Sequence, residues 1–69
     1  MEGLQIGRTV HYVDGTGRHC AAIITGIVNV TTGDVWLEVF PPGERPFCID
    51  ATHSVKTTFV STWHWPERV

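Results

Sequence analysis

The stretch His-Cys-Ala-Ala-Ile-Ile-Thr-Gly-Ile-Val-Asn-Val at residues 19–30 decides the fold. It is the longest apolar run in the chain, and its Ile and Val side chains favour a strand, because β-branched residues crowd the preceding turn of a helix. Its twelve residues exceed the usual strand length, and an internal glycine commonly marks a bulge or a bend. We therefore predict one long strand, bent at Gly26, that takes part in two sheets.

Shorter strands are predicted on either side of this stretch. Residues 8–13 and 35–40 alternate in polarity and are rich in β-branched and aromatic side chains. Residues 47–50 are expected to form a further short strand, and the β-branched positions within 55–62 indicate the last one. Turns or loops are expected at the segments rich in glycine, proline or polar residues, at 14–17, 31–34, 41–46 and 51–54.

The alternation also assigns side chains to faces, because neighbouring residues of a strand point in opposite directions. The strand at 35–40 is predicted to place three residues inward, Val35, Leu37 and Val39, and three outward, Trp36, Glu38 and Phe40. Two large aromatic rings are thereby left for an outer surface or a second layer, which is unusual in so small a domain.

Five short strands, one of them long and bent, are typical of a small closed barrel or a two-sheet sandwich. We predict an all-β, five-stranded SH3-like barrel, because few other folds hide their strand edges with so few residues. One domain is expected to cover residues 1–69, with 1–7 as a lead-in and 63–69 as an extended aromatic C-terminal tail. Leu4 and Ile6 of the lead-in are expected to plug one end of the barrel.

The composition narrows the class of partner. The net charge is −2 and the five cations are scattered singly, whereas nucleic-acid binders normally carry a basic stripe. Charged residues make up only 17% of the chain, which suggests that another copy or a partner covers part of the surface. Neither a signal peptide nor an apolar run long enough to span a membrane is apparent, so we expect a soluble protein of the cell interior.

Histidine and cysteine supply ligand types for zinc, with four and two residues respectively. No Cys-x-x-Cys or His-x-x-x-His pair occurs, and the adjacent His19 and Cys20 must point to opposite faces of a strand. We therefore predict scattered histidines, no metal ligands and no cofactor. Cys20 and Cys48 lie within apolar strands, where thiols usually pack without reacting, so we expect free thiols and no catalytic residue.

The aromatic residues are the clearest sign of a binding surface, since Trp and Tyr are enriched in binding hot spots. Trp63 and Trp65 share one face of an extended segment and His64 points the opposite way. The two tryptophans either fold back as a lid over an open barrel end or offer a surface to a partner, and the two interpretations are compatible. The candidate partner-binding or ligand-binding residues are Trp36, Phe40, Trp63, His64, Trp65, Tyr12 and Arg18.

Several motifs together resemble a known group of proteins. In chain order they are Val10-His11-Tyr12-Val13, Arg18-His19 before Ala22-Ile23-Ile24, Val35 to Phe40 with a following proline, and Thr62-Trp63-His64-Trp65-Pro66-Glu67. This pattern resembles small, mostly uncharacterised phage and prophage proteins that end in a Trp-His-Trp-Pro-Glu tail. The resemblance spans nearly the whole chain and implies a viral or prophage origin. Ser61 departs from the pattern, which has glycine there.

Three functions are expected, in descending order of support. The first is a non-enzymatic, phage-encoded module that contacts a host factor, a virion component or another copy of itself, in the host cytoplasm or the virion. The second is a counter-defence protein that binds a small nucleotide-like ligand by stacking on tryptophan, with Arg8, Arg18 or Arg45 holding its charge. The third is a metal-dependent hydrolase that uses the histidines.

Overall fold

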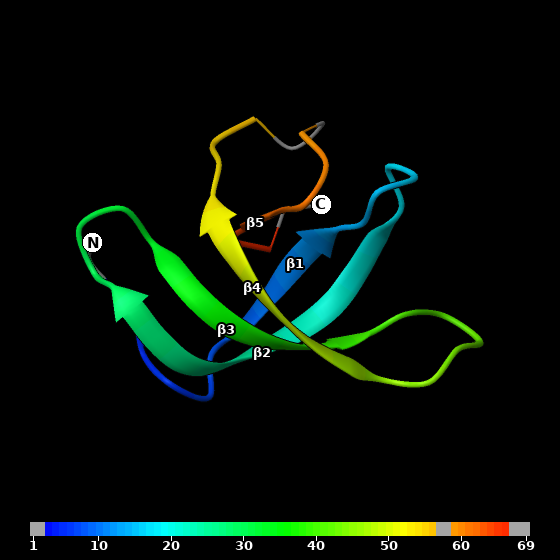
Figure 1. The fold of residues 1–69 in the computed structure, drawn as a ribbon, viewed down its shortest axis with the longest axis horizontal. Coiled ribbons are helices and arrows are strands. Elements are labelled where there is room, and N and C mark those ends of the chain that lie inside the picture. Colours follow the sequence, from blue (N-terminus) through cyan, green and yellow to red (C-terminus); the bar gives the residue numbers. More distant parts are fainter. Residues whose placement is uncertain (1–2, 57–58, 67–69) are drawn as a thin grey trace.

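Five strands close into a barrel in the computed structural model, which describes residues 3–56 and 59–66 (Figure 1). The strands are β1 (Thr9–Val13), β2 (His19–Asn29), β3 (Asp34–Phe40), β4 (Phe47–His53) and β5 (Thr62–His64). Each pairs with the next, and β5 returns to β1. The predicted all-β barrel is confirmed, and the architecture is consistent with an SH3-like fold. The described residues form no helix that could cross a membrane.

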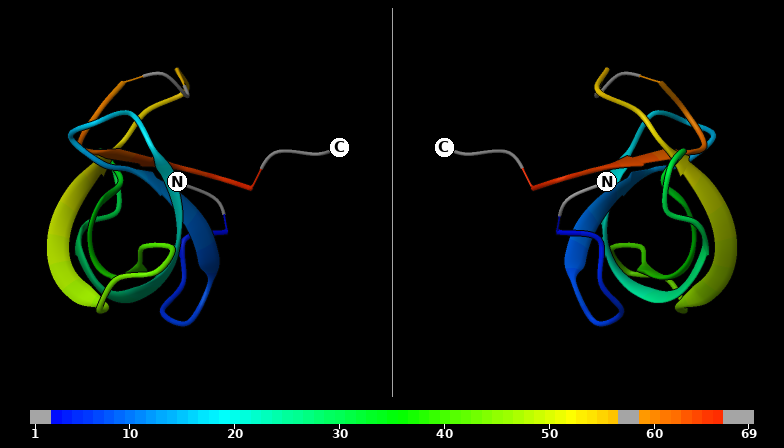
Figure 2. Two further views of the ribbon diagram at one scale, coloured as in Figure 1. Left: turned by 90° about the vertical axis from the view of Figure 1, so that its right-hand side faces the viewer. Right: turned by 90° about the vertical axis from the view of Figure 1, so that its left-hand side faces the viewer.

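Strand β2 is the long strand that the sequence predicts, but it belongs to one closed sheet, so the expectation of two sheets is wrong. Its first half pairs with β1, from the partners Val13 and His19 to Thr9 and Ile23. It also pairs with β3, and that register shifts between Ile24 and Gly26 and again further along the strand. Figure 2 looks along the barrel and shows β2, β3 and β4 curving around its axis. Strand β2 thus has β1 on one edge and β3 on the other, and the irregularity beside Gly26 lies in its pairing with β3.

Alternate side chains of these strands fill the barrel. The buried core consists of Val10, Tyr12, Cys20, Ala22, Ile24, Val35, Leu37, Val39, Ala51 and Trp63. The predicted faces of the strand at 35–40 are confirmed, because its three inward residues are fully buried and Trp36 and Phe40 are exposed. Leu4 packs against the core as expected, whereas Ile6 is 68% exposed, so its predicted role as a plug is wrong.

The chain between β4 and β5 departs from the prediction. Strand β4 continues to His53, through the segment expected to turn, and the Thr52 hydroxyl on it donates to Asp34 Oδ1 at 2.7 Å. The predicted strand over 55–62 is wrong for its described residues apart from Thr62, and residues 57 and 58 lie outside the described chain. β-Branched residues favour strands only where a neighbouring strand can pair with them, and β5 already fills that place.

Strand β5 closes the barrel from within the segment expected to be a tail. It runs antiparallel to β1, with Trp63 opposite Tyr12, and parallel to β4, with Trp63 opposite His53. The chain enters β5 through Ser61, whose φ of 59° lies in the left-handed region and whose N–H donates to the Val13 carbonyl at 2.7 Å. The predicted tail is therefore part of the barrel wall as far as His64; residues 67–69 of that tail lie outside the described chain.

Candidate functional site

The predicted site residues lie at different depths in the structure. Tyr12 and Trp63 belong to the core, so neither side chain offers a surface to a partner in this fold. Trp36 and Phe40 are 48% and 41% exposed on the outer face of β3. His64 points to the outer side of the barrel as expected but is only 3% exposed. The predicted site residues therefore do not form one surface, because some are buried and others are exposed.

Trp63 lies on strand β5 and fills the core of the barrel, so it does not act as a lid over one end. Its indole Nε1 donates to the Gly33 carbonyl at 2.8 Å, and its ring lies 4.7 Å from that of His53. Trp65 is half-buried and packs against the core, with its ring centroid 5.1 Å from that of Trp63. The Arg8 guanidinium lies 5.3 Å from the Trp65 ring centroid, a cation–π contact. Both tryptophans are therefore engaged within the domain.

Arg18 is held in the turn between β1 and β2. Its Nε donates to Asp14 Oδ2 at 3.0 Å, and its Nη2 bonds to Glu44 of the β3–β4 loop. Asp14 also accepts hydrogen bonds from the Thr16 hydroxyl and from the Arg18 amide, and these contacts hold the pKa of its carboxyl well below the usual range. Arg18 is thus part of a turn network that fixes the hairpin.

The outer side of β3 and β4 combines rings and carboxylates. Along β3, Trp36, Glu38 and Phe40 point outward, and Asp50 of β4 is the cross-strand partner of Trp36. Asp50 is exposed and Glu38 is half-buried. We call these four residues, Trp36, Glu38, Phe40 and Asp50, the acidic–aromatic face. Cys48 lies within it, opposite Glu38.

Two contacts hold the acidic–aromatic face in place. The Trp36 side chain lies beside Gly26, its cross-strand partner on β2, where an added Cβ would be in ordinary van der Waals contact with Trp36 Cδ1 at 3.5 Å. The Cys48 thiol donates to Glu38 Oε2 at 2.8 Å, and this hydrogen bond raises the pKa of the thiol. Trp36 and Glu38 are therefore each in contact with a neighbouring strand.

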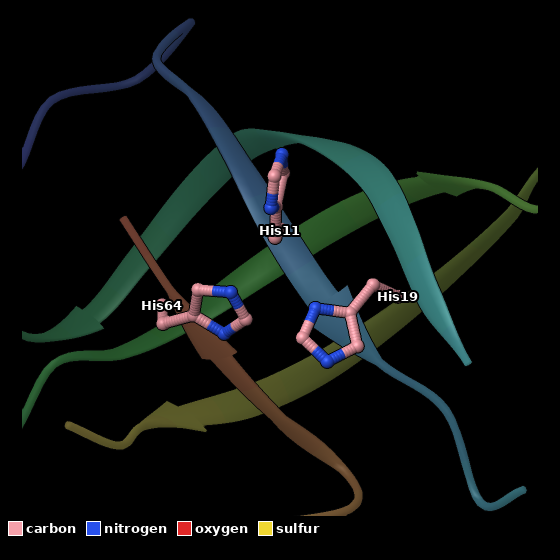
Figure 3. Close-up of side chains that lie close together, drawn as sticks. All are labelled: His11, His19 and His64. Atoms are coloured by element: carbon pink, nitrogen blue, oxygen red, sulfur yellow. The ribbon is translucent and has the colours of Figure 1, made fainter. Parts of the chain in front are cut away.

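Three histidines meet on the other side of the barrel, although they are far apart in sequence. His11 of β1, His19 of β2 and His64 of β5 each offer one ring nitrogen, and these three atoms all lie within 4.8 Å of one another (Figure 3). The ring centroids of His19 and His64 are 5.1 Å apart, and those of His11 and His64 are 5.4 Å apart. We call these residues the histidine cluster. It is a candidate site for a metal ion.

The histidine cluster cannot be predicted from local sequence, because its three members have no short ligand spacing in the chain. The cluster depends on strand register: His11 is the cross-strand partner of His64, and His19 is the partner of Val13, two residues further along β1. Outward-facing residues two apart on paired strands are diagonal neighbours. The β1–β2 hairpin register could have placed His11 beside His19, but His64 joins them only through barrel closure.

Comparison with known proteins does not assign the chain to a family. No family model matches the chain, and neither a curated protein nor a solved structure matches it. The resemblance to phage and prophage proteins therefore stays a prediction.

Proposed function

We propose that this protein is a non-enzymatic binding module that acts through protein–protein contact, and that the acidic–aromatic face is its contact surface. The observation that carries the proposal is the placement of Trp36, a half-exposed indole that lies beside Gly26 of β2 and opposite the carboxylate-bearing Asp50 of β4. Tryptophan is the residue type most enriched in binding hot spots, and a ring that is already ordered loses little entropy when a partner covers it.

The charge of the acidic–aromatic face indicates the chemistry of its partner. Glu38 and Asp50 flank the indole, and the outward-facing described residues of β3 and β4 include no lysine or arginine. A partner segment with arginine or lysine side chains can stack on Trp36 and pair with the carboxylates at once. We therefore propose a basic protein segment as the partner, with a second copy of the chain as the competing occupant.

The nucleotide-binding alternative has less support. It needs tryptophan and arginine together at one open site. Arg18 is paired with Asp14 and Glu44, and Trp65, the tryptophan that Arg8 contacts, is half-buried and packs against the core. The open tryptophan, Trp36, has carboxylates around it, and these repel a phosphate. We therefore give the protein-contact proposal precedence.

The test is a titration of isotope-labelled protein by NMR with two peptides of equal length, one rich in arginine and one rich in glutamate. The arginine peptide is expected to shift the indole resonance of Trp36 and the amides of Glu38 and Asp50, in a salt-dependent way. The glutamate peptide is expected to shift none of them. Light scattering in parallel detects the second copy as occupant, which would replace the proposed basic partner.

Two matched variants make the test specific. Phe40→Ala removes a ring from the acidic–aromatic face, and Phe59→Ala removes a somewhat more exposed ring from the segment before β5. Phe40→Ala is expected to weaken peptide binding by roughly five- to 30-fold, as for a hot-spot contact, and Phe59→Ala is expected to leave it unchanged. Equal effects of the two variants, or equal binding of the two peptides, would overturn the proposal.

A further inference from the structure

We propose that the histidine cluster binds a divalent transition-metal ion of the zinc and copper class. Its three ligands come from three strands, namely His11 of β1, His19 of β2 and His64 of β5. This site is separate from the acidic–aromatic face, and the proposal does not depend on the protein-contact function.

The geometry is close to that of a bound ion. The three ring nitrogens lie within 4.8 Å of one another, whereas ligand nitrogens about 2.05 Å from a tetrahedral zinc ion lie roughly 3.3 Å apart. Each pair therefore has to approach by at most about 1.5 Å, the difference between the two values. His19 is exposed and can supply the movement for the two pairs that include it by rotating its side chain. The His11–His64 pair needs a rotation of the half-buried His11 ring.

The fixed part of the site is already built into the barrel wall. His64 is 3% exposed, and its strand partner His11 is half-buried. They lie beside Val13, which is fully buried and pairs with His19 on one side and Thr62 on the other. An apolar surround of this kind limits competition from water for the ion.

A buried ring nitrogen of one member of the cluster also points to a ligand. Nδ1 of His11 is inaccessible to solvent and makes no hydrogen bond to the part of the chain that the structure describes. A buried imidazole nitrogen is normally satisfied by a hydrogen bond or by a metal. Coordination of an ion by the cluster would meet this need.

The donor set selects the kind of ion. Three neutral imidazoles suit zinc, copper or nickel, whereas calcium and magnesium prefer oxygen ligands. Acidic residues are absent from the cluster as the described chain defines it. Three protein ligands are also fewer than the four that close a structural zinc site, so the ion would keep a position for a further ligand.

The test is calorimetric titration of untagged, chelator-treated protein with Zn²⁺, and with Mg²⁺ as the control ion, at pH 7.5. We expect one Zn²⁺ per chain with a dissociation constant of roughly micromolar or below and no heat with Mg²⁺. Titration with Co²⁺ is expected to produce visible absorption of the intensity that a four-coordinate site shows. Absence of Zn²⁺ binding at concentrations of about 100 μM would overturn the proposal.

The exposed ligand provides the decisive variant. His19→Ala leaves the buried residues of the cluster in place and is expected to weaken Zn²⁺ binding by roughly 100-fold. His53→Gln is the matched control, because His53 faces Trp63 inside the barrel, and it is expected to bind Zn²⁺ as the unaltered protein does. Circular dichroism confirms that both variants fold. If His19→Ala binds Zn²⁺ unchanged, or if His53→Gln loses it, the assignment of ligands is wrong.

Discussion

The indole nitrogen of Trp63 donates to the carbonyl oxygen of Gly33, which joins β5 to the turn between β2 and β3 across thirty positions of sequence. Trp63 is fully buried, so this bond ties the closing strand to the opposite side of the core. The acceptor is the carbonyl of a glycine whose φ is 78°, in the turn of the β2–β3 hairpin. One side chain thus connects barrel closure with hairpin geometry.

Trp63→Phe is expected to destabilise the barrel by about 2–4 kcal/mol, because it removes buried ring surface and leaves the Gly33 carbonyl without its donor. Urea denaturation followed by circular dichroism measures the free energy of unfolding. The matched control is Trp36→Phe on the outer face, expected to change it by less than about 0.5 kcal/mol. Similar losses in both variants would contradict the distinct roles assigned to the two tryptophans.

Ser61→Gly is expected to stabilise the protein by about 0.5–1 kcal/mol, because a residue with a Cβ is strained at φ of 59° and glycine is not. The hydrogen bond from the residue 61 amide to Val13 is retained in this variant. The comparison variant is Ser54→Gly, which removes a hydroxyl that accepts a hydrogen bond from the Lys56 amide and should destabilise. Thermal unfolding of both variants decides the matter, and a lower Tm for Ser61→Gly would count against strain. Ser61 also stands where the phage resemblance implies glycine.

The stability of the protein is expected to fall as the pH falls through about 6.5. Burial lowers the pKa of His53 below its ordinary value of 6.5, so the unfolded chain takes up this proton at a higher pH than the folded chain. The free energy of unfolding therefore decreases with falling pH until the pH drops below the folded-state pKa. Denaturation of chelator-treated protein at several pH values between about 7.5 and 5.5 measures the slope. His53→Gln should show a flatter slope, and an unchanged slope would assign the effect to other groups.

Cys48 is expected to alkylate slowly for an exposed thiol, because its hydrogen bond to Glu38 raises its pKa and lowers the thiolate fraction. Glu38→Gln should increase its rate with iodoacetamide at pH 7.5 by roughly two- to ten-fold. The buried Cys20 serves as an internal control and should stay protected in both proteins. Mass spectrometry of digested samples distinguishes the two sites. An alkylation rate of Cys48 that is the same in the unaltered protein and in Glu38→Gln would contradict this prediction.

Local pattern was enough to predict β2, its bend at Gly26 and the inward and outward faces of β3. These features follow from side-chain alternation and from one glycine, both of which act within a few residues. Strand β5 was misplaced because it has only three residues, and its strand structure depends on pairing with β1 and β4. Residues 55 and 56 lie in a segment rich in β-branched residues, but they do not form a strand.

The candidate sites also differ in whether local sequence pattern can predict them. Trp36 and Phe40 could be predicted as outward-facing from alternation alone. The histidine cluster could not, because His64 reaches His11 and His19 only through the register of the closed barrel. The sequence predicts Trp63 either as a lid over a barrel end or as a surface for a partner, whereas its full burial in the core is a consequence of that same closure.

The pairing of β5 with both β1 and β4 also bears on aggregation during folding. The edges of β1 and β4 remain open until residues 62–64 pair with them. Unpaired strand edges recruit other chains, so the protein is most prone to aggregate before β5 pairs. A strand of three residues thus protects the edges of the whole sheet.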